Sequence, residues 1–424
     1  MTKYLIIGGS IGTLGAIEGI RKLDLRGEIV VVSEERQTPY SRPSIGKYLE
    51  GDLSEASLGF GSSDFWATND VKVLHGSKAV SLDAEGKRVQ LDDGRFLTFD
   101  KLLLATGAKP ILPRINGLEK VGVHTFSGLS DVQAIRGQLS RAHQAIVVGG
   151  GLIGVAAAEA LVNLKIEVAV VELRNWLLSL LLSRDAAAII EGAMRQRGVS
   201  IMTGLSVKEV EGRKDQPSEV GKVVLSDDSR VDCDLVIMAV GVTPRKELAA
   251  QAGVKTNRGI LVDRFMETSI QGIYACGDAA EGYDFLEAKN QVLALWPLAR
   301  LGGRVAGSNM AGGKTEYPGG ISMSAMRYFG IPVVSAGNGA QTAPEGSEIL
   351  SSSSKNARRE IVLVGDRVVG FTLVGDVEPA GLFLNLLQTR TVVSAFRSTL
   401  LDPNFSFANL PESLRRRTLM EAWA

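Results

Sequence analysis

The sequence predicts an α/β fold in which two similar parallel-sheet units are followed by a C-terminal α+β domain. Three observations support this prediction. A pattern of strand, glycine-rich turn, helix and strand occurs twice, at residues 4–34 and 145–172. Apolar strands that stop at glycine turns follow each copy, as expected where further strands join a sheet. From about residue 317 the pattern changes to short strands followed by helices.

Composition places the chain among ordinary globular proteins. At 424 residues it is too long for one core, so two or three domains are expected. The 47 basic and 47 acidic residues balance, which indicates neither nucleic acid nor a membrane surface as a partner. No apolar run reaches the length of a membrane span. The N-terminus enters a strand without a basic leader, so we expect no signal peptide and a cytoplasmic location.

The first copy of the repeated pattern, at residues 4–34, is imperfect. Ser10 and Thr13 take the second and third glycine positions of a G-x-G-x-x-G frame. Ser10 narrows the space for a pyrophosphate, although its hydroxyl could donate a hydrogen bond to one. Thr13 is expected to push the helix slightly off the sheet, unless Gly12 and Gly15 restore the close approach.

The second copy reads AIVVGGGLIGVAAAEALVNLKIEVAVVE at residues 145–172 and carries the whole frame. Gly149 permits the tight turn, Gly151 lets a pyrophosphate approach the backbone, and Gly154 lets the helix pack on the strand. Free N–H groups at the helix N-terminus would face the phosphates. Glu172 ends the second strand, where a carboxylate can accept hydrogen bonds from an adenosine ribose. These features together predict two Rossmann-like dinucleotide-binding domains.

Four further segments continue this pattern along the chain. The strands DKLLLATGAKP (100–110), DLVIMAVGVTP (234–244) and TSIQGIYACGDAAE (268–281) each meet a glycine turn. The segment LWPLARLGGRVAGSNMAGG (295–313) is expected to be helical. In the C-terminal domain, the low-complexity run Ser351–Ser354 is expected to form an exposed loop between strands.

Taken in order, GGSIGT, PYSRP, ATGAKP, GGGLIG, AVGVTP and IYACGD resemble the two-dinucleotide flavoproteins of the pyridine nucleotide–disulfide oxidoreductase superfamily, whose fold is that of glutathione reductase. PYSRPSIGKYLEG and LWPLARLGGRVAGSNMAGG are similar to the branch that contains rubredoxin reductases, ferredoxin reductases and the flavin-binding part of nitrite reductases. The resemblance covers essentially the whole chain. It implies an FAD-binding domain at residues 1–112 and 258–328, an NAD(H)-binding domain at 113–257 and a C-terminal interface domain at 329–424.

The resemblance also implies which residues hold the cofactors. On the FAD side, Glu34 would hold the adenosine ribose, Arg42 and Pro43 would lie beside the flavin, and Asp278 would hold the ribityl and pyrophosphate region. The helix that begins at Trp296 should point its N-terminus at the flavin pyrimidine. The full set of expected cofactor-binding residues is Gly8, Ser10, Gly12, Glu34, Arg42, Pro43, Thr106, Gly107, Gly149, Gly151, Ile153, Gly154, Glu172, Gly241, Gly277, Asp278, Trp296 and Pro297.

Lys47 and Glu159 are the expected catalytic pair. In the superfamily a lysine at the position of Lys47 reaches the reactive edge of the flavin, and a glutamate at the position of Glu159 pairs with it. A cation at that edge would stabilise the electron-rich reduced flavin, and the carboxylate would keep the desolvated charge paired.

Cysteine usage distinguishes the branches of the superfamily. Disulfide reductases carry a C-x-x-x-x-C pair in the first flavin helix, and other branches carry one reactive cysteine near residue 44. Residues 40–50 read YSRPSIGKYLE and contain no thiol. Cys233 and Cys276 lie far apart and are expected to be buried small residues, with neither a disulfide nor a metal site.

The sequence therefore predicts an FAD-dependent NAD(P)H oxidoreductase, with NADH preferred over NADPH. Hydride would pass between NADH and FAD, and electrons between FAD and an Fe–S or rubredoxin-like protein. Two alternatives remain open: an electron-transfer subunit of a larger redox complex, and an NADH oxidase that uses oxygen or a small molecule. A flavin- or NADH-binding sensor without turnover is a third interpretation, and a homodimer is a further expectation.

Overall fold

The computed structural model of the chain describes residues 1–37, 39–60 and 64–416. Two compact units are present. Unit 1 comprises Met1–Ile111, Ser127–Val132 and Gly241–Ile321, and unit 2 comprises Leu112–Phe126, Gln133–Val240 and the chain from Ser322 onward. The predicted three-domain division is finer than these two units, and its boundaries stay a prediction. Among the described helices, none is long and apolar enough to cross a bilayer.

A parallel five-stranded sheet forms the centre of unit 1. The two strands of the first sequence copy lie side by side in register, with Ile7 opposite Val32. Their apolar side chains are almost fully buried, as a sheet covered on both faces requires. The strand order is β19 (Ile273–Ala275), β7 (Lys101–Leu104), β1 (Lys3–Ile7), β2 (Glu28–Ser33) and β3 (Val71–His75).

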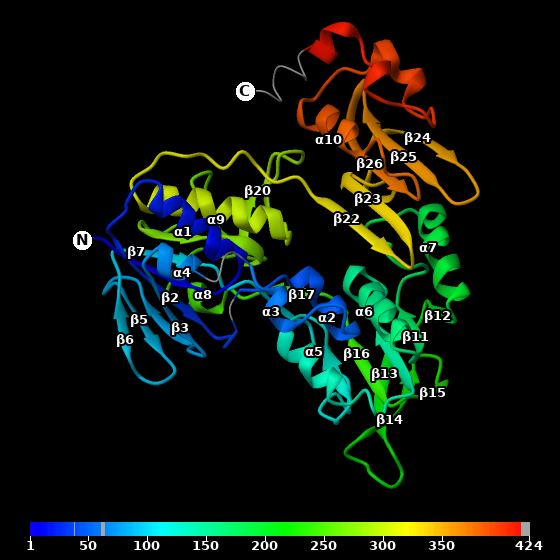
Figure 1. Ribbon diagram of the computed structural model, residues 1–424, viewed down its shortest axis with the longest axis horizontal. Helices are drawn as coiled ribbons and strands as arrows, with labels where there is room; N and C mark the ends of the chain where they lie inside the picture. Colours follow the sequence, from blue (N-terminus) through cyan, green and yellow to red (C-terminus); the bar gives the residue numbers. More distant parts are fainter. Residues whose placement is uncertain (38, 61–63, 417–424) are drawn as a thin grey trace. The chain divides into compact units, whose positions relative to one another are not determined.

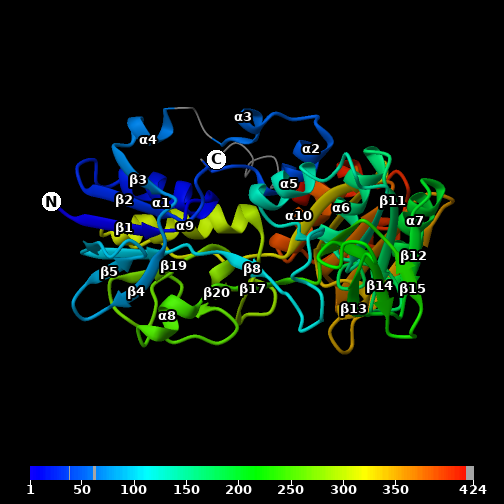
Figure 2. The ribbon, with the colours of Figure 1, turned by 90° about the horizontal axis from the view of Figure 1, so that it is seen from below.

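Helices α1 (Ile11–Arg21) and α9 (Trp296–Met310) lie side by side in unit 1 (Figure 1, Figure 2). Glycines on both helices allow this close approach. A Cβ atom added to Gly15 would lie 2.2 Å from the Arg300 carbonyl oxygen, and one added to Gly307 would lie 2.0 Å from the Ala16 carbonyl oxygen. Gly15 therefore brings α1 close to α9, whereas the sequence interpretation had it restore contact with the sheet.

The remaining elements of unit 1 are short. Besides the parallel sheet, the described residues of unit 1 form three small sheets and four short α-helices. The sheets are β4 (Ala79–Asp83), β5 (Arg88–Leu91) and β6 (Phe96–Thr98); β8 (Ala108–Pro110) with β17 (Val242–Pro244); and β18 (Ile260–Leu261), β20 (Ala280–Tyr283) and β21 (Asn290–Gln291). The helices are α2 (Ile45–Glu50), α3 (Glu55–Leu58), α4 (Phe65–Thr68) and α8 (Glu247–Gln251).

Unit 2 contains the second parallel sheet, built around the second sequence copy. The strand order is β12 (Ser200–Thr203), β11 (Glu167–Glu172), β10 (Gln144–Val148), β16 (Leu235–Met238) and β9 (Val123–Thr125). An antiparallel sheet of β13 (Val207–Gly212), β14 (Val220–Leu225) and β15 (Arg230–Asp232) shares its apolar core. The helices are α6 (Leu152–Asn163) and α7 (Arg184–Gln196), and α5 (Leu129–Arg136) precedes them. Both copies therefore form the predicted Rossmann-like sheets.

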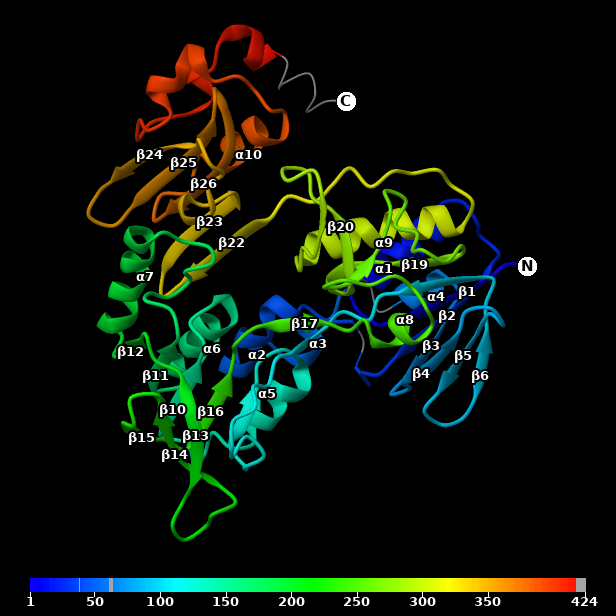
Figure 3. The ribbon, with the colours of Figure 1, turned by 180° about the vertical axis from the view of Figure 1, so that it is seen from behind.

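The C-terminal part of unit 2 is an antiparallel sheet with helix α10 (Ala380–Gln388) packed against it (Figure 3). Phe383 on the helix stacks on Phe405 at 5.1 Å and contacts Phe371 on the sheet at 5.6 Å. This arrangement confirms the predicted α+β character. The strand order is β22 (Met323–Tyr328), β23 (Ile331–Gly337), β26 (Arg367–Val374), β25 (Arg358–Val364) and β24 (Glu348–Ser353).

The expectation of a loop at Ser351–Ser354 is wrong. Ser351, Ser352 and Ser353 belong to β24 and pair in antiparallel register with Glu360, Arg359 and Arg358 of β25. The strand lies at the edge of the sheet, where its polar side chains can remain in solvent while its backbone pairs on one side only. The polar run can therefore be a strand, because the neighbouring strand β25 supplies the buried side chains.

Candidate dinucleotide-binding sites

The glycine turn between β1 and α1 has the geometry of a phosphate-binding turn. Gly8 has φ +124°, and a Cβ atom there would lie 2.1 Å from the Ala105 carbonyl oxygen, so only glycine fits. Ser10 precedes α1 in extended backbone, and its hydroxyl does not cap the helix. The hydroxyl of Thr13 donates to the Gly8 carbonyl oxygen at 2.7 Å. Thr13 is completely buried, so the third glycine position accepts a side chain that bonds back to the turn.

The turn between β10 and α6 shows why all three glycines occur in the second copy. A Cβ atom on Gly154 would lie 1.8 Å from the Gly149 carbonyl oxygen. Only glycine at this position therefore lets the helix pack so closely against the strand. A Cβ atom on Gly151 would meet nothing within 4 Å, so this face of the turn is open. Leu152 and Ile153 in the first turn of α6 are each more than one-third exposed. This open cradle at a helix N-terminus fits a pyrophosphate.

Glu172 is bound to the glycine turn itself. Its Oε2 atom accepts a hydrogen bond from the Gly150 N–H at 2.6 Å, and its Oε1 atom accepts one from the Arg174 N–H at 2.8 Å. The Gly150 carbonyl oxygen accepts from the Leu178 N–H at 2.7 Å. The carboxylate therefore stands beside the turn, where its remaining lone pairs can receive ribose hydroxyls. Its role in ribose binding stays a prediction.

Glu34 occupies a different position from Glu172. The residue of β2 that corresponds to Glu172 of β11 is Ser33. Ser33 comes directly after Val32, which pairs with Ile7, and Glu172 comes directly after Val171, which pairs with Val148. A Cβ atom on Gly9 would lie 2.5 Å from the Ser33 hydroxyl oxygen, which is the place that Glu172 holds beside Gly150.

Glu34 therefore lies one residue further along, in a cluster of charges. Its two carboxylate oxygens pair with Lys78 at 3.0 Å and with Arg245 at 2.7 Å. Partial burial opposes ionisation, but these two cations lower the pKa of Glu34 below its ordinary value. Any contact between Glu34 and the FAD ribose stays a prediction, and it would have to accommodate both cations.

Arg42 and Asp278 place opposite charges in the predicted flavin region of unit 1. Arg42 pairs with Glu35, donates to the Ser127 carbonyl oxygen at 2.8 Å and lies over the Tyr40 ring at 5.3 Å. Burial raises the pKa of Asp278, and Arg42 opposes that shift. The Asp278 carboxylate accepts no hydrogen bond from the described residues, so it suits a ligand that brings hydroxyl donors, as a ribityl chain does. Pro43 follows Arg42 in a short 3₁₀ turn and is exposed.

The ATGAKP and AVGVTP motifs meet each other in unit 1. The Thr106 hydroxyl donates to the Arg245 carbonyl oxygen at 2.7 Å, and the Arg245 N–H donates to the Gly107 carbonyl oxygen at 2.9 Å. The Ile111 N–H donates to the Gly241 carbonyl oxygen at 2.9 Å. These bonds flank the pairing of β8 with β17, so Thr106, Gly107 and Gly241 help to join the two motifs. A contact of these residues with a cofactor stays a prediction.

Trp296 and Pro297 open α9 as expected. The Trp296 ring contacts Phe60 at 4.5 Å, and its Nε1 atom is buried without a hydrogen-bond partner among the described residues. A buried indole N–H usually finds an acceptor, so this orphaned donor fits a bound polar group at the helix N-terminus. Gly277 follows β19 with φ +69°, and its Cβ position faces Ala299 of α9 at 3.4 Å. The structure thus brings these motifs together at one end of unit 1.

Lys47 and Glu159 belong to different units, and each has partners in its own unit. Lys47 on α2 pairs with Glu50 at 2.8 Å and with Asp52 at 3.4 Å, and the Glu50 hydrogen bond raises the pKa of Lys47. The Oε1 atom of Glu159 accepts from the Phe329 N–H at 2.7 Å. The pairing of Lys47 with Glu159 stays a prediction.

Both cysteines are buried, as predicted. Burial raises the pKa of Cys233 to about 12, and the neighbouring Asp234 adds to this. Burial also raises the pKa of Cys276 to about 12, with Asp278 adding to it. The Sγ atom of Cys276 packs against Gly12, the second residue of α1. A Cβ atom added to Gly12 would lie 3.0 Å from this sulfur. Neither thiol can supply a thiolate at neutral pH.

Sequence reasoning missed several residues that the structure places at these sites. Glu35 binds Arg42, Arg245 binds Glu34, and Tyr328 and Phe329 bind α6. Glu35 lies close to a motif and could have been found by its proximity. Arg245 directly follows the AVGVTP motif, although its partner Glu34 is distant in the sequence. Tyr328 and Phe329 lie outside every motif, and no local signal in the sequence predicts their contacts.

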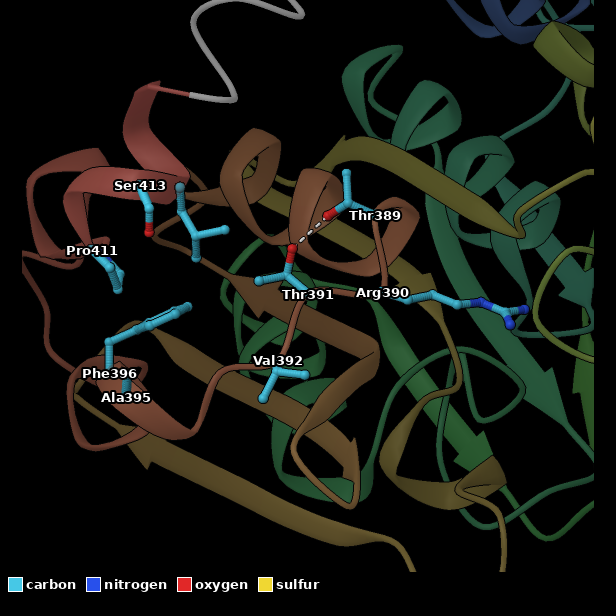
Figure 4. A pocket seen from close by; sticks show the side chains of 9 residues that line it. Thr389, Arg390, Thr391, Val392, Ala395, Phe396, Pro411 and Ser413 are labelled. Carbon is cyan, nitrogen blue, oxygen red and sulfur yellow. Dashed lines mark hydrogen bonds between the residues drawn. The ribbon is translucent and has the colours of Figure 1, made fainter.

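A hollow of about 440 Å³ lies in the C-terminal part, after α10 (Figure 4). The Thr389 and Thr391 hydroxyls at its edge lie 2.7 Å apart, and the Arg390 side chain points away from it. Phe396, Pro411 and Ser413 form the other side. None of the predicted site residues is among the described residues that line this hollow.

Two Rossmann-like sheets, each with a glycine turn that fits a pyrophosphate, define a two-dinucleotide oxidoreductase. Comparison with known proteins agrees. Residues 2–303 match the model of the pyridine nucleotide-disulphide oxidoreductase family, and the chain belongs to this family. It is an FAD-dependent oxidoreductase that uses NAD(H).

Individual relatives cover nearly the whole chain. It is 32% identical to the NADH-dependent phenylglyoxylate dehydrogenase subunit epsilon of Aromatoleum evansii, over 100% of this chain and 98% of that protein. It is 27% identical to the NADH-rubredoxin oxidoreductase of Clostridium acetobutylicum, over 89% of this chain and 92% of that protein. Among solved structures, an NAD-dependent persulfide reductase from A. fulgidus matches with a TM-score of 0.87 and 27% identity, over 99% of this chain and 83% of that one.

Proposed function

We propose that this protein passes electrons from NADH to an Fe–S or rubredoxin-like redox protein. One observation carries the proposal: two dinucleotide turns occur in a chain whose two cysteines are both buried, with pKa values raised to about 12. A thiol relay within the chain is therefore not available. Electrons have to leave for an acceptor outside the chain, as the name of the rubredoxin-reducing relative also suggests.

The residues have the following proposed roles. The turn at Gly8 and the N-terminus of α9 hold FAD in unit 1, with Asp278 accepting hydrogen bonds from its sugar chain. The turn at Gly149 and the N-terminus of α6 hold NADH in unit 2. FAD held there would supply the capacity to take up a hydride from NADH and to release electrons singly. Lys47 keeps a positive charge near the flavin, because Glu50 raises the pKa of its ammonium.

Cofactor content gives the first test. The purified protein should be yellow and contain about one FAD per chain, because Thr13 fits the first turn without disturbing Gly8. A colourless preparation that added FAD cannot reconstitute would reject the FAD assignment.

Electron acceptors give the second test. NADH oxidation is measured without oxygen, with rubredoxin or a [2Fe–2S] ferredoxin as acceptor, and under air with no added acceptor. We expect turnover with the redox proteins to exceed turnover with oxygen by at least about tenfold. Faster consumption under air would favour an NADH oxidase instead.

A second function is favoured by one comparison. The relative that matches this chain over 98% of its own length is named as a subunit of an NADH-dependent dehydrogenase. The chain would then act as the electron-transfer subunit of a larger complex, with poor turnover alone. Affinity purification from the native source tests this: Fe–S subunits at a fixed ratio support the complex, and an isolated homodimer supports the free reductase. Either arrangement fits a cytoplasmic location, which we also propose.

A further inference from the structure

The hairpin turn between β22 and β23 has an unusual composition. Phe329 and Gly330 form the two-residue loop between the paired residues Tyr328 and Ile331. Their φ angles are +49° and +85°, the pattern of a type I′ turn, which favours Asn-Gly. Phenylalanine at positive φ is strained, and here its side chain is also buried, at 8% exposure. A strained residue that the surrounding structure holds in place is reason to look for what it contacts.

This turn contacts helix α6 at two points, which lie about two helical turns apart. The Tyr328 hydroxyl donates to the Leu152 carbonyl oxygen at 2.8 Å. The Phe329 N–H donates to Oε1 of Glu159 at 2.7 Å. Leu152 and Glu159 are seven residues apart and therefore lie on one face of the helix. Positive φ at Phe329 belongs to the backbone conformation that presents this N–H to the carboxylate.

The tyrosine is suited to a permanent donor role. Burial raises the pKa of Tyr328, and the nearby Glu159 adds to this, so the hydroxyl stays protonated. The sheet that carries the turn also contacts the start of α7, within the same unit. The Ser183 hydroxyl before α7 donates to Glu360 of β25 at 2.6 Å, and Arg358 pairs with Asp185 at 3.3 Å. The turn therefore extends from a sheet that is fixed next to the helix.

We infer that Tyr328 and the Phe329 amide are positioning groups for the nicotinamide site. They hold the first turn of α6, whose free N–H groups would receive the NADH pyrophosphate, and they fix one oxygen of Glu159. The inference rests on the proposed placement of NADH at the Gly149 turn. It gives the C-terminal sheet, which includes β22 and β23, a role in cofactor binding that neither glycine motif indicates.

Tyr328→Phe in the FAD-loaded protein tests the inference, because it removes one hydroxyl and keeps the ring. We expect the Kd and KM for NADH to rise roughly threefold to tenfold, the range for loss of one hydrogen bond, with kcat changed less than about twofold. Hydrogen–deuterium exchange should quicken in a peptide spanning residues 149–158. Exchange in β10 should stay as in the unmodified protein.

Ser335→Ala is the matched control. It also removes a buried hydroxyl from the same sheet, one that bonds Thr372 at 3.2 Å and not α6. It should leave the Kd for NADH unchanged. Unchanged exchange and Kd in Tyr328→Phe would overturn the inference, as would a lower melting temperature with unchanged Kd. If the unmodified protein binds no NADH, the proposed function fails, while the exchange measurement still decides whether Tyr328 orders α6.

Discussion

We predict that cofactor choice depends on Glu172. Its carboxylate accepts from the N–H groups of Gly150 and Arg174, so it is held at the edge of the glycine turn. A fixed negative charge there favours ribose hydroxyls and repels a 2′-phosphate. One basic side chain follows at Arg174, but the acid is retained. We therefore expect NADH over NADPH by at least about tenfold in kcat/KM, equivalent to roughly 1.4 kcal/mol.

Glu172→Ala should narrow this preference, chiefly by weakening NADH. Steady-state kcat/KM for the two cofactors measures the change. Glu167→Ala, at the exposed start of the same strand, is the control and should leave the ratio as it is. Comparable kcat/KM for NADH and NADPH in the unmodified protein would refute the assignment.

Lys47 is the second residue with a defined test. Its hydrogen bond to Glu50 raises its pKa, so it is a cation throughout the working pH range. Lys47→Met should slow flavin reduction by NADH while FAD stays bound. A lost charge at a site of developing negative charge typically costs about 2–4 kcal/mol in the transition state. Stopped-flow absorbance measures the rate, with the exposed Lys208→Met as control. An unchanged rate would place Lys47 away from the flavin.

At the scale of elements, α1, which follows the Gly8 turn, packs closely against α9. A Cβ atom on Gly307 would lie 2.0 Å from the Ala16 carbonyl oxygen, whereas one on Gly192 of α7 would meet nothing within 4 Å. Gly307→Ala should therefore destabilise the protein by about 1–3 kcal/mol, through overpacking. Gly192→Ala should stabilise it by about 0.5–1 kcal/mol, because alanine favours the helix.

Chemical denaturation of both variants, with FAD content measured alongside, separates these effects. Only Gly307→Ala should also lose flavin, because only α9 carries Trp296 at the FAD end. Equal effects of the two substitutions would contradict the close approach of α1 and α9.

A second property of this helix pair depends on pH. Glu18 on α1 accepts from Arg300 at 2.6 Å and Arg304 at 2.7 Å on α9. Burial opposes ionisation of Glu18, but the two arginines lower its pKa below the ordinary 4.5. A lowered folded-state pKa contributes stability above the unfolded value, and this is lost as pH falls through the folded value.

Glu18→Gln should therefore cost about 1 kcal/mol at pH 7 and progressively less below pH 4.5. Thermal unfolding of both proteins across that range measures the difference. A gap between them that persists undiminished at pH 3 would show that the loss is not electrostatic.

Sequence reasoning predicted elements better than contacts between them. The strands and turns around Gly8 and Gly149 were predictable because each pattern is local and its geometry requires glycine. The strand at Ser351 was not predictable, because it forms by backbone pairing with β25, a partner that the local pattern does not indicate. Gly15 was expected to face the sheet and instead faces α9, since helix–helix packing does not appear in local spacing. The contacts of Tyr328 with α6 join residues 176 positions apart and are decided by the tertiary fold.

At the scale of the whole molecule, the position of the thiols determines what kind of reductase this chain can be. Relatives in one superfamily differ in whether electrons pass through cysteine, and this chain has only Cys233 and Cys276. Cys233 is 3% exposed and Cys276 is completely buried. Burial raises the pKa of both thiols to about 12, so both stay protonated at neutral pH. Thiolate chemistry is therefore too scarce to carry turnover.

The double variant Cys233→Ala, Cys276→Ala should consequently keep NADH-dependent reduction of a one-electron acceptor within about twofold of the unmodified protein. Alanine leaves space behind Gly12 where the Cys276 sulfur packs, so a modest loss of stability is expected without loss of FAD. Iodoacetamide treatment of the folded unmodified protein should likewise leave the rate unchanged. Ferricyanide reduction under nitrogen measures the rate, and flavin absorbance confirms cofactor content. Loss of turnover with FAD still bound would contradict this prediction. It would mean that a thiol takes part and that electrons have a route within the chain, which the burial of both sulfurs argues against.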